Sequence, residues 1–348
     1  MNGTLYQNIW EKVVSLMRDL KDYIRNYQLD SYILSESPLI LASFWYDFLK
    51  NLEKSAKVLP QTEPIWFFFS IGNYKSELLV QEIKAQIAEI HLKYPLYNFW
   101  FMNNSQEEDS YFKKAGLNSI FANHNTFLDE NRYRIMNVKK KYDAIYLARF
   151  TPVKRHYLAK DIKRLLLIGT YKPEEIDYYN SSRAILDFAT YKAKVLGIFV
   201  TNYMNQAHVG LALSDFEGAM YASSEYLLSG LPVVSTPSVG GRDAYYREDY
   251  VKIVEPDSRA VAEAVYELIK NPPDADMIRT ETIKIMNYQR QTLISVIENI
   301  YHETGTKRNF SDEWQRVFIH KLGLRTRIPF PIYRNRILRE STVLQVNK

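Results

Sequence analysis

The sequence predicts an α/β protein built from two parallel-sheet domains, and three observations support this fold class. Short apolar runs of strand length alternate along the chain with helical runs, which is the order typical of parallel sheets. The 348 residues exceed what one ordinary hydrophobic core accommodates. A polar and basic stretch, residues 129–141 (DENRYRIMNVKKK), separates two apolar strands and marks the predicted domain boundary.

The first domain is predicted to be short and to be preceded by helices. Residues 5–27 carry apolar side chains at steps of three or four, which predicts an amphipathic helix, and a second helix is predicted over residues 39–54. The elements predicted to follow Pro60 and Pro64 are a strand over 65–71, a helix to about residue 94, a strand over 98–102, a short helix to residue 114 and a strand over 119–122.

The second domain continues the alternation of strands and helices, which predicts a doubly wound sheet. Its predicted strands cover 142–147, 164–169, 195–200, 209–213, 232–234 and 251–254, and its predicted helices cover 174–191, 203–207 and 259–270. A long helix is predicted from about residue 277 to 302. The predicted parts are therefore a first domain over 1–135, a second over 142–275, and a final helix with a basic tail over 276–348.

Charge is distributed unevenly along the chain. The net charge is +5, but residues 306–348 hold ten Lys and Arg against three Asp and Glu, or +7, which leaves 5 − 7 = −2 for the rest. Arginines in this tail alternate with apolar residues, a mixture that suits an anionic membrane surface. Nucleic-acid binding and a tail that packs on the body are the alternatives, and we expect no nucleic-acid partner.

Several classes of protein are disfavoured by composition. There is no cysteine, so a disulfide, a thiolate nucleophile or a cysteine metal site is excluded. The charged, amphipathic N-terminus does not resemble a signal peptide, and no apolar run approaches the ~18 residues of a membrane span. We therefore expect a cytoplasmic protein, with peripheral attachment to the inner face of the plasma membrane as a further hypothesis.

The candidate functional stretch runs from Leu213 to Tyr246. Two carboxylates in it, Glu217 and Glu225, are separated by seven residues, and Gly218 follows the first directly. A glycine before a helix start exposes backbone N–H groups, which bind phosphate or sugar oxygens. The predicted helix carries Glu225 and ends at Gly230. The alternative is that Glu217 only complements the helix dipole and that Glu225 is solvated.

This order, with a Gly-Leu-Pro, an apolar strand and a Gly-Gly after the second Glu, resembles the donor-site signature of retaining GT-B glycosyltransferases with an E-x7-E motif (glycosyl transferases group 1, family 4-like). The resemblance implies two Rossmann-like domains facing a cleft. It also implies that Glu217 contacts the donor sugar and Glu225 the ribose, with Gly218 and Ala219 beside the diphosphate.

Two cations follow the predicted strand 142–147. Arg149 and Lys154 would lie at the carboxyl edge of a parallel sheet, where open α/β folds bind ligands. The same family resemblance implies that they clamp the donor diphosphate, each contact contributing about 1.5–3 kcal/mol. Arg155 and His156 come next and make the loop unusually cationic. The alternative is an ordinary solvated loop.

The remaining motifs give one further candidate and no metal site. His124 follows the strand predicted over 119–122, and the resemblance implies a histidine near the reacting sugar, although a loop-ordering role is the alternative. Asp274 and Asp276 precede a helix and are explained by capping. The sequence lacks G-x-G-x-x-G, Walker and His-Glu-x-x-His motifs, so neither a metal nor another cofactor is expected.

These expectations combine into one functional hypothesis. The chain is expected to transfer a sugar, with retention of configuration, from a nucleotide-diphosphate sugar to a glycan or lipid-linked acceptor in bacterial surface polysaccharide assembly. The resemblance covers residues 142–270 directly and the first domain by topology alone. A sugar-binding subunit without catalysis, and an epimerase or phosphorylase on the same scaffold, are the alternatives.

Overall fold

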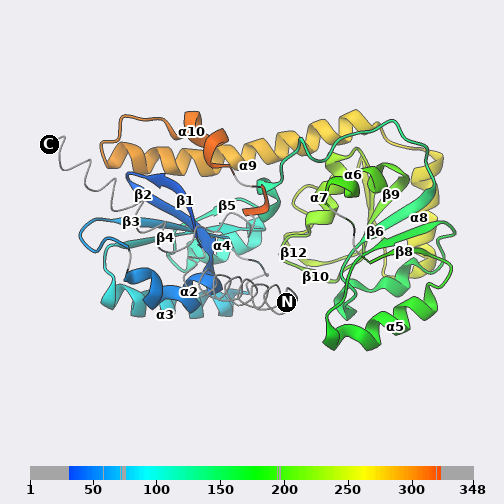
Figure 1. Cartoon of the computed structure of the whole chain (residues 1–348), viewed down its shortest axis with the longest axis horizontal. Helices are drawn as coiled ribbons and strands as arrows, with labels where there is room; N and C mark the ends of the chain where they lie inside the picture. Colours follow the sequence, from blue (N-terminus) through cyan, green and yellow to red (C-terminus); the bar gives the residue numbers. More distant parts are fainter. Residues whose placement is uncertain are drawn as a thin grey trace, which may run out of the picture. The chain divides into compact units, whose positions relative to one another are not determined.

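A computed structural model of the chain describes residues 31–57, 59–70, 72, 76–193, 195, 197–318 and 320–322. The predicted helix over 5–27 and most of the basic tail lie outside these residues. The chain divides into two compact units, one within residues 1–70, 85–100 and 300–348 and the other within 71–84 and 101–299. Both units combine helices with parallel strands, which confirms the predicted α/β class (Figure 1). The domain limits at residues 135 and 142 remain a prediction.

The first unit contains β1 to β3 and part of β4 of a five-stranded sheet, whose order is β1-β2-β3-β4-β5. Its strands are β1 (Ser31–Glu36), β2 (Leu39–Phe44), β3 (Ile65–Ser70) and the first part of β4 (Tyr97–Asn103). Strand β2 is antiparallel to β1 and parallel to β3. The helices assigned wholly or partly to this unit are α2 (Trp45–Ala56), α3 (Glu77–Lys93), the end of α9 (Ala275–Glu303), α10 (Phe310–Val317) and the short η5 (His320–Leu322).

The helix predicted over residues 39–54 is wrong in its first part. Residues Leu39–Phe44 form β2, and the helix begins only at Trp45. All but the last residue of β2 are buried, because the strand lies between β1 and β3. A short apolar run buried on both sides has no alternating polar positions, so periodicity alone cannot distinguish it from a buried helix.

The second unit is built on a six-stranded, fully parallel sheet with the order β13-β11-β9-β6-β7-β8. The strands are β6 (Tyr142–Leu147), β7 (Leu165–Ile168), β8 (Thr190–Lys192), β9 (Ala207–Ala212), β11 (Val233–Ser235) and β13 (Val251–Ile253). Helices α6 (Gly197–Asn205), α7 (Tyr221–Leu228) and α8 (Ser258–Lys270) pack against β9 (Figure 1). The predicted doubly wound sheet is confirmed.

Shorter elements complete the second unit. They are α4 (Gln106–Lys114), β5 (Ser119–Phe121), η1 (His124–Phe127), η2 (Pro152–Lys154), η3 (His156–Ala159), η4 (Pro173–Glu175), α5 (Ile176–Ile185), β10 (Phe216–Glu217) and β12 (Val239–Gly240). The long helix α9 confirms the one predicted from residue 277 to 302. Asp274 accepts a hydrogen bond of 2.7 Å from the backbone N–H of Met277, as its predicted capping role requires.

Two predictions between residues 174 and 207 are wrong. The helix predicted over 174–191 ends at Ile185, and residues Thr190–Lys192 form strand β8 instead. The strand predicted over 195–200 is largely helix, because α6 begins at Gly197. The apolar run Gly197–Val200 carries no clear period, and packing of α6 against β9 decides its conformation.

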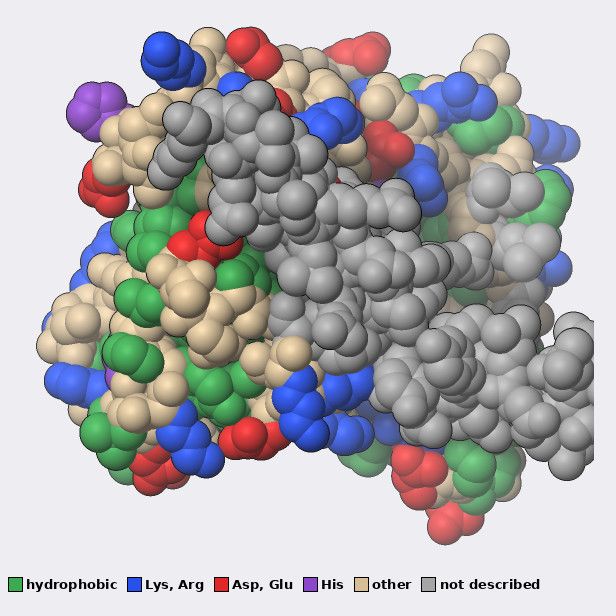
Figure 2. All heavy atoms as spheres, turned by 60° about the vertical axis from the view of Figure 1, so that its left-hand side comes forward, with side chains coloured by type: hydrophobic (Ala, Val, Ile, Leu, Met, Phe, Trp, Pro, Cys, Tyr) green, Lys and Arg blue, Asp and Glu red, His purple; other side chains and the backbone are tan. Residues whose placement is uncertain are grey.

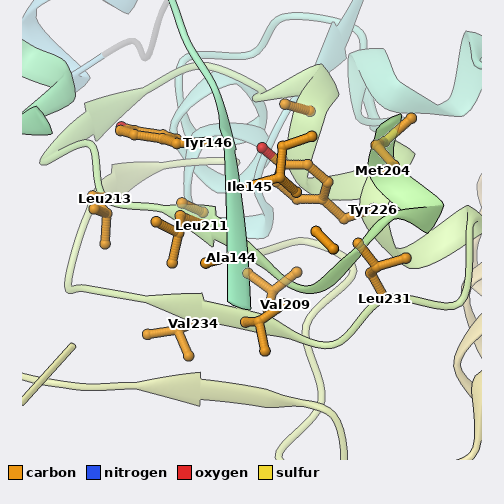
Figure 3. Packing of buried hydrophobic residues seen from close by; sticks show 14 of the residues in the cluster. Ala144, Ile145, Tyr146, Met204, Val209, Leu211, Leu213, Tyr226, Leu231 and Val234 are labelled. Carbon is orange, nitrogen blue, oxygen red and sulfur yellow. The ribbon is translucent and has the colours of Figure 1, made fainter. Parts of the chain in front are cut away.

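A contiguous apolar core holds the second unit together. Figure 3 shows Tyr226 of α7 among side chains of β6 and β9, including Ile145 and Val209. A Cβ at Gly210 of β9 would lie 2.3 Å from the ring of Tyr226, so only glycine allows this approach. The Tyr226 hydroxyl accepts a hydrogen bond of 2.7 Å from the Leu147 N–H. Helix α7 is thus fixed on the two central strands.

The described surface is mixed in charge. On the face seen in Figure 2, basic and acidic side chains are interspersed with hydrophobic ones over the described part of the chain. The excess of positive charge found in residues 306–348 falls mostly outside the described residues. Among the described helices, none is both long enough and apolar enough to cross a bilayer.

Candidate functional site

The strand order of the second unit defines where a ligand can bind. The chain runs from β6 outward through β7 to β8, and then from β9 outward on the other side, so the order reverses between β6 and β9. Open parallel sheets bind ligands outside the carboxyl ends of the strands at this reversal. We call the loop over 148–160 after β6 and the loop over 213–220 after β9 the switch-point site.

Lys154 and Glu217, the predicted cation and the first predicted carboxylate, form an ion pair across the switch-point site. Lys154 Nζ contacts Glu217 Oε1, and the two side chains are only 16% and 15% exposed. Burial lowers the pKa of Lys154 to about 8, and the positive charges of Arg149 and Arg242 act in the same direction. With a pKa of about 8 the ammonium is still charged at neutral pH.

Arg155 holds this loop in place. It adopts the left-handed backbone region with φ 47° between η2 and η3. Its Nε donates to the Leu213 carbonyl at 2.7 Å and its Nη2 to Thr236 Oγ1 at 2.7 Å. The guanidinium therefore joins the loop after β6 to the ends of β9 and β11, and it acts as a tether that keeps the neighbouring Lys154 beside Glu217.

Arg242 is a second tether that sequence reasoning missed. It is fully buried, and its Nη1 donates to the carbonyls of Ala212 at 2.9 Å and Ser214 at 2.7 Å. Its Nε pairs with Asp243 Oδ1 at 2.7 Å. A buried arginine must satisfy its donors, and Arg242 does so on the backbone that leads to Glu217. Its position directly after Gly240-Gly241 was the only sequence signal.

Arg149 lies at the end of β6 as predicted, but it is not a free solvated cation. Its Nε is 3.2 Å from Glu175 Oε1, with exposures of 50% for Arg149 and 13% for Glu175. Glu175 ends η4, in the loop after β7. Both predicted cations of the switch-point site thus have carboxylate partners.

His156 does not add positive charge to the loop, so the expectation of an unusually cationic loop is wrong at this residue. It is buried and stacks on Phe150 with ring centroids 4.3 Å apart. Burial, reinforced by the charge of Lys154, lowers the pKa of His156 to about 3. The imidazole is therefore neutral and packs as part of the core.

Glu225 is buried, which excludes the alternative that it is a solvated residue. It lies in the second turn of α7, and its Oε1 accepts a hydrogen bond of 2.8 Å from the Tyr133 hydroxyl. Tyr133 comes from the polar stretch 129–141, which the sequence analysis treated only as a domain boundary. Helix α6 anchors that stretch, because Thr201 Oγ1 donates to the Arg132 carbonyl at 2.7 Å.

Gly218 and Ala219 connect β10 to α7. Strand β10 pairs in parallel with β12, with Glu217 opposite Gly240. The Gly241 N–H donates to the Gly218 carbonyl at 2.8 Å. A Cβ at Gly241 would lie 2.3 Å from the Asn104 carbonyl, so glycine is required there. The backbone of Gly241 therefore lies against another loop of the same unit.

His124 lies next to the start of α7. Its Nε2 is hydrogen-bonded to the Tyr221 hydroxyl, and its backbone N–H donates to Asn104 Oδ1 at 2.9 Å. The neighbouring Asn125 Nδ2 donates to the Met220 carbonyl at 2.9 Å. The structure therefore places His124 beside the segment that carries Gly218 and Ala219.

These residues can bind an anion through the positive charges of Lys154 and Arg149. Within the described residues no group of three or more His, Asp or Glu side chains is arranged to hold a metal ion. The structure brings Lys154 and Glu217 together and places Arg149, Gly218, Ala219, Glu225 and His124 on neighbouring segments of one unit. Sequence reasoning named Arg155 only as a loop cation, and it missed Tyr133, Glu175, Tyr221 and Arg242.

Part of the chain matches a known protein family. Residues 136–271 match the family model described as "Glycosyl transferases group 1", a segment that covers less than half of the chain and includes the whole switch-point site. No curated protein matches the chain by sequence.

Solved structures resemble the chain over a longer span. Sucrose-phosphate synthase from Thermosynechococcus elongatus is 14% identical with a TM-score of 0.54, covering 77% of this chain and 74% of that chain. Anabaena HepE in complex with UDP is 13% identical with a TM-score of 0.55, covering 73% and 82%.

A third solved structure is similar over most of this chain but over less of its own. A TarM mutant from S. aureus, in complex with fondaparinux, alpha-GlcNAc-glycerol and UDP, is 12% identical with a TM-score of 0.50, covering 80% of this chain and 55% of that chain. At such identities the likeness concerns the fold, and it supports the expected GT-B architecture.

Proposed function

We propose that the chain is a glycosyltransferase that uses a nucleotide-diphosphate sugar and retains the anomeric configuration. The observation that carries this proposal is the Lys154–Glu217 pair at the reversal of strand order, within the segment that matches group 1 glycosyltransferases. The similar structures of HepE and TarM contain UDP, which supports a nucleotide donor.

In this proposal the cations act on the leaving group. Lys154 and Arg149 stabilise the negative charge that develops on the departing diphosphate, together with the backbone N–H groups at the start of α7. The donor diphosphate takes the place of Glu217 beside Lys154, and Glu217 is released to orient the sugar. We propose that these groups carry out transfer without a metal ion.

Glu225 and His124 are assigned complementary roles. Glu225 accepts hydrogen bonds from the ribose hydroxyls, and its carboxylate is already oriented by Tyr133. His124 faces the reacting sugar from its position beside Tyr221. Gly218 and Ala219 provide backbone close to the diphosphate.

The acceptor is proposed to be a glycan or a lipid-linked saccharide in bacterial surface polysaccharide assembly. A lipid-linked acceptor would explain the arginines between residues 325 and 339, which would hold a cytoplasmic enzyme at the inner face of the plasma membrane. Sedimentation with anionic liposomes should fall when residues 321–348 are removed. Equal sedimentation of both forms would contradict membrane binding by the tail.

The function is tested by a thermal-shift screen against UDP-, GDP-, dTDP- and ADP-linked sugars, since a ligand that binds only the folded state raises its melting temperature. Transfer or hydrolysis of the best donor is then measured. Glu225→Ala and Lys154→Ala should each lower turnover by about 10²-fold, the scale of one lost preorganised contact. Binding without turnover would favour a sugar-binding subunit, and phosphorolysis without nucleotide a phosphorylase.

A further inference from the structure

Arg149 has a carboxylate partner that belongs to a different loop. Arg149 follows β6, whereas Glu175 ends the η4 turn after the neighbouring strand β7. Glu175 Oε1 lies 3.2 Å from Arg149 Nε. The contact therefore joins the carboxyl ends of two adjacent strands at the edge of the switch-point site.

Glu175 is held firmly by its own turn. Its Oε2 accepts a hydrogen bond of 2.8 Å from the backbone N–H of Lys172, the residue directly before η4. The two loops are also joined through backbone, because the Phe150 N–H donates to the Thr170 carbonyl at 2.9 Å. A Cβ at Gly169 would lie 1.8 Å from the Ala148 carbonyl. Both carboxylate oxygens of Glu175 therefore have partners, Oε1 with Arg149 and Oε2 with the Lys172 backbone.

The contact with Glu175 leaves the two terminal nitrogens of the Arg149 guanidinium available. A guanidinium has five N–H donors, of which Nε carries one and the two terminal nitrogens carry four. The ion pair runs through Nε, and the Arg149 side chain is 50% exposed. Among the described residues the Arg149 guanidinium has no other hydrogen-bond or ion-pair partner. The terminal nitrogens can therefore form a bidentate contact with phosphate.

Stability alone does not account for this pair. Exposed ion pairs contribute about 0–1 kcal/mol to the free energy of unfolding. The neighbouring pair of Lys172 with Glu174 is an example of such an exposed ion pair. There Nζ and Oε1 are 3.6 Å apart, and the side chains are 57% and 67% exposed. Glu175 is instead 13% exposed and fixed on both oxygens.

We propose that Glu175 is a positioning residue that holds Arg149 by its Nε, so that the terminal nitrogens of Arg149 bind the diphosphate of the nucleotide donor. This inference rests on the proposed function and assigns to the same site a residue that recognises the substrate indirectly. It predicts that Glu175 strengthens binding of the phosphate part of the ligand and has no effect on binding of the nucleoside part.

The test measures binding to the full-length protein by calorimetry. The ligands are whichever of UDP, GDP, dTDP and ADP binds best, and its parent nucleoside. Glu175→Ala should weaken diphosphate binding about 2- to 5-fold, the range for one partly exposed ion pair, with no change for the nucleoside. The matched control Glu174→Ala should change neither. Glu175→Gln, which removes the charge but keeps a polar side chain of the same size beside Nε, should lose less than Glu175→Ala.

A double-mutant cycle shows whether Glu175 acts through Arg149. The variant with both Arg149→Ala and Glu175→Ala should bind the diphosphate no more weakly than Arg149→Ala alone. Additive losses, or equal losses of diphosphate and nucleoside binding in Glu175→Ala, would overturn the inference while leaving the proposed function intact. If the wild-type protein binds none of the four diphosphates, the proposed function fails and this inference fails with it.

Discussion

Tyr133 donates a hydrogen bond of 2.8 Å to Oε1 of Glu225, so a residue of the polar stretch 129–141 orients a carboxylate of the candidate site. Both side chains are buried. Burial, together with the negative charge of Glu225, raises the pKa of Tyr133 well above its ordinary value, so the hydroxyl keeps its proton and remains a donor. Helix α6 supports the segment by holding the Arg132 carbonyl.

Tyr133→Phe should therefore weaken binding of a nucleoside diphosphate. The variant removes the hydroxyl and leaves the ring, so a loss of about 1.5–3 kcal/mol, typical of a hydrogen bond to a charged group, is the upper range. Calorimetry with the best-binding diphosphate measures the change. Tyr157→Phe, at a tyrosine that is 45% exposed, serves as the control. Equal affinity in wild type and Tyr133→Phe would contradict a role for this contact in binding.

Removing one partner of the Lys154–Glu217 pair should destabilise the protein, and removing both charges should restore part of the loss. Lys154→Met leaves a largely buried carboxylate without its cation, which we expect to cost about 1–3 kcal/mol, less than for a fully buried pair. The double variant with Glu217→Gln has no unpaired charge. Midpoints of urea unfolding measure both, with Lys160→Met at an exposed lysine as control. Additive losses would disprove the coupling.

Nucleotide binding should depend on pH through Lys154. Its pKa is lowered to about 8, chiefly by burial, so the ammonium loses its proton as the pH rises through that value. Affinity for a nucleoside diphosphate should therefore decline above about pH 8. Lys154→Arg should keep its affinity to higher pH, because a guanidinium stays protonated there. The same decline in both proteins would assign the titration to another group.

Stability should depend on pH through His156. Burial lowers its folded-state pKa from 6.5 to about 3, so between these values the unfolded chain binds a proton that the folded protein does not. Stability should thus fall as the pH decreases from about 6.5 toward 3, by up to about 1.4 kcal/mol per pH unit from this group. His156→Gln should show a shallower decline in urea midpoint over this range than wild type. The exposed His302→Gln is the control and should leave the slope unchanged.

Gly210→Ala should destabilise the second unit. The added Cβ would lie 2.3 Å from the Tyr226 ring, which cannot move away without disturbing α7. Overpacking of this kind costs about 1–3 kcal/mol, and thermal unfolding measures it. Gly197→Ala is a matched control, because a Cβ there meets no atom of the described residues within 4 Å. Similar melting temperatures for the two variants would contradict the packing argument.

The order of strands and helices in the second unit was largely readable from the sequence. Strands β6, β7 and β9 are apolar runs of the right length, and Gly230 ends α7 in the left-handed region with φ 72°, as its position after the helix predicted. Where an apolar run carries no clear period, the prediction failed, as at β2 and α6. The positions of Arg149 and Lys154 followed from the end of β6.

The sequence by itself determined the α/β class, the strand endings that carry the cations, and the spacing of Glu217 and Glu225, because these are local patterns along one segment. Only the tertiary structure decided the partners: Glu225 with Tyr133, Glu217 with Lys154, and Arg149 with Glu175. These contacts join residues on different segments of the chain, and local sequence patterns do not encode which segments the sheet brings together. The physical reason is that strand order, set by burial of the whole core, fixes which ends are neighbours.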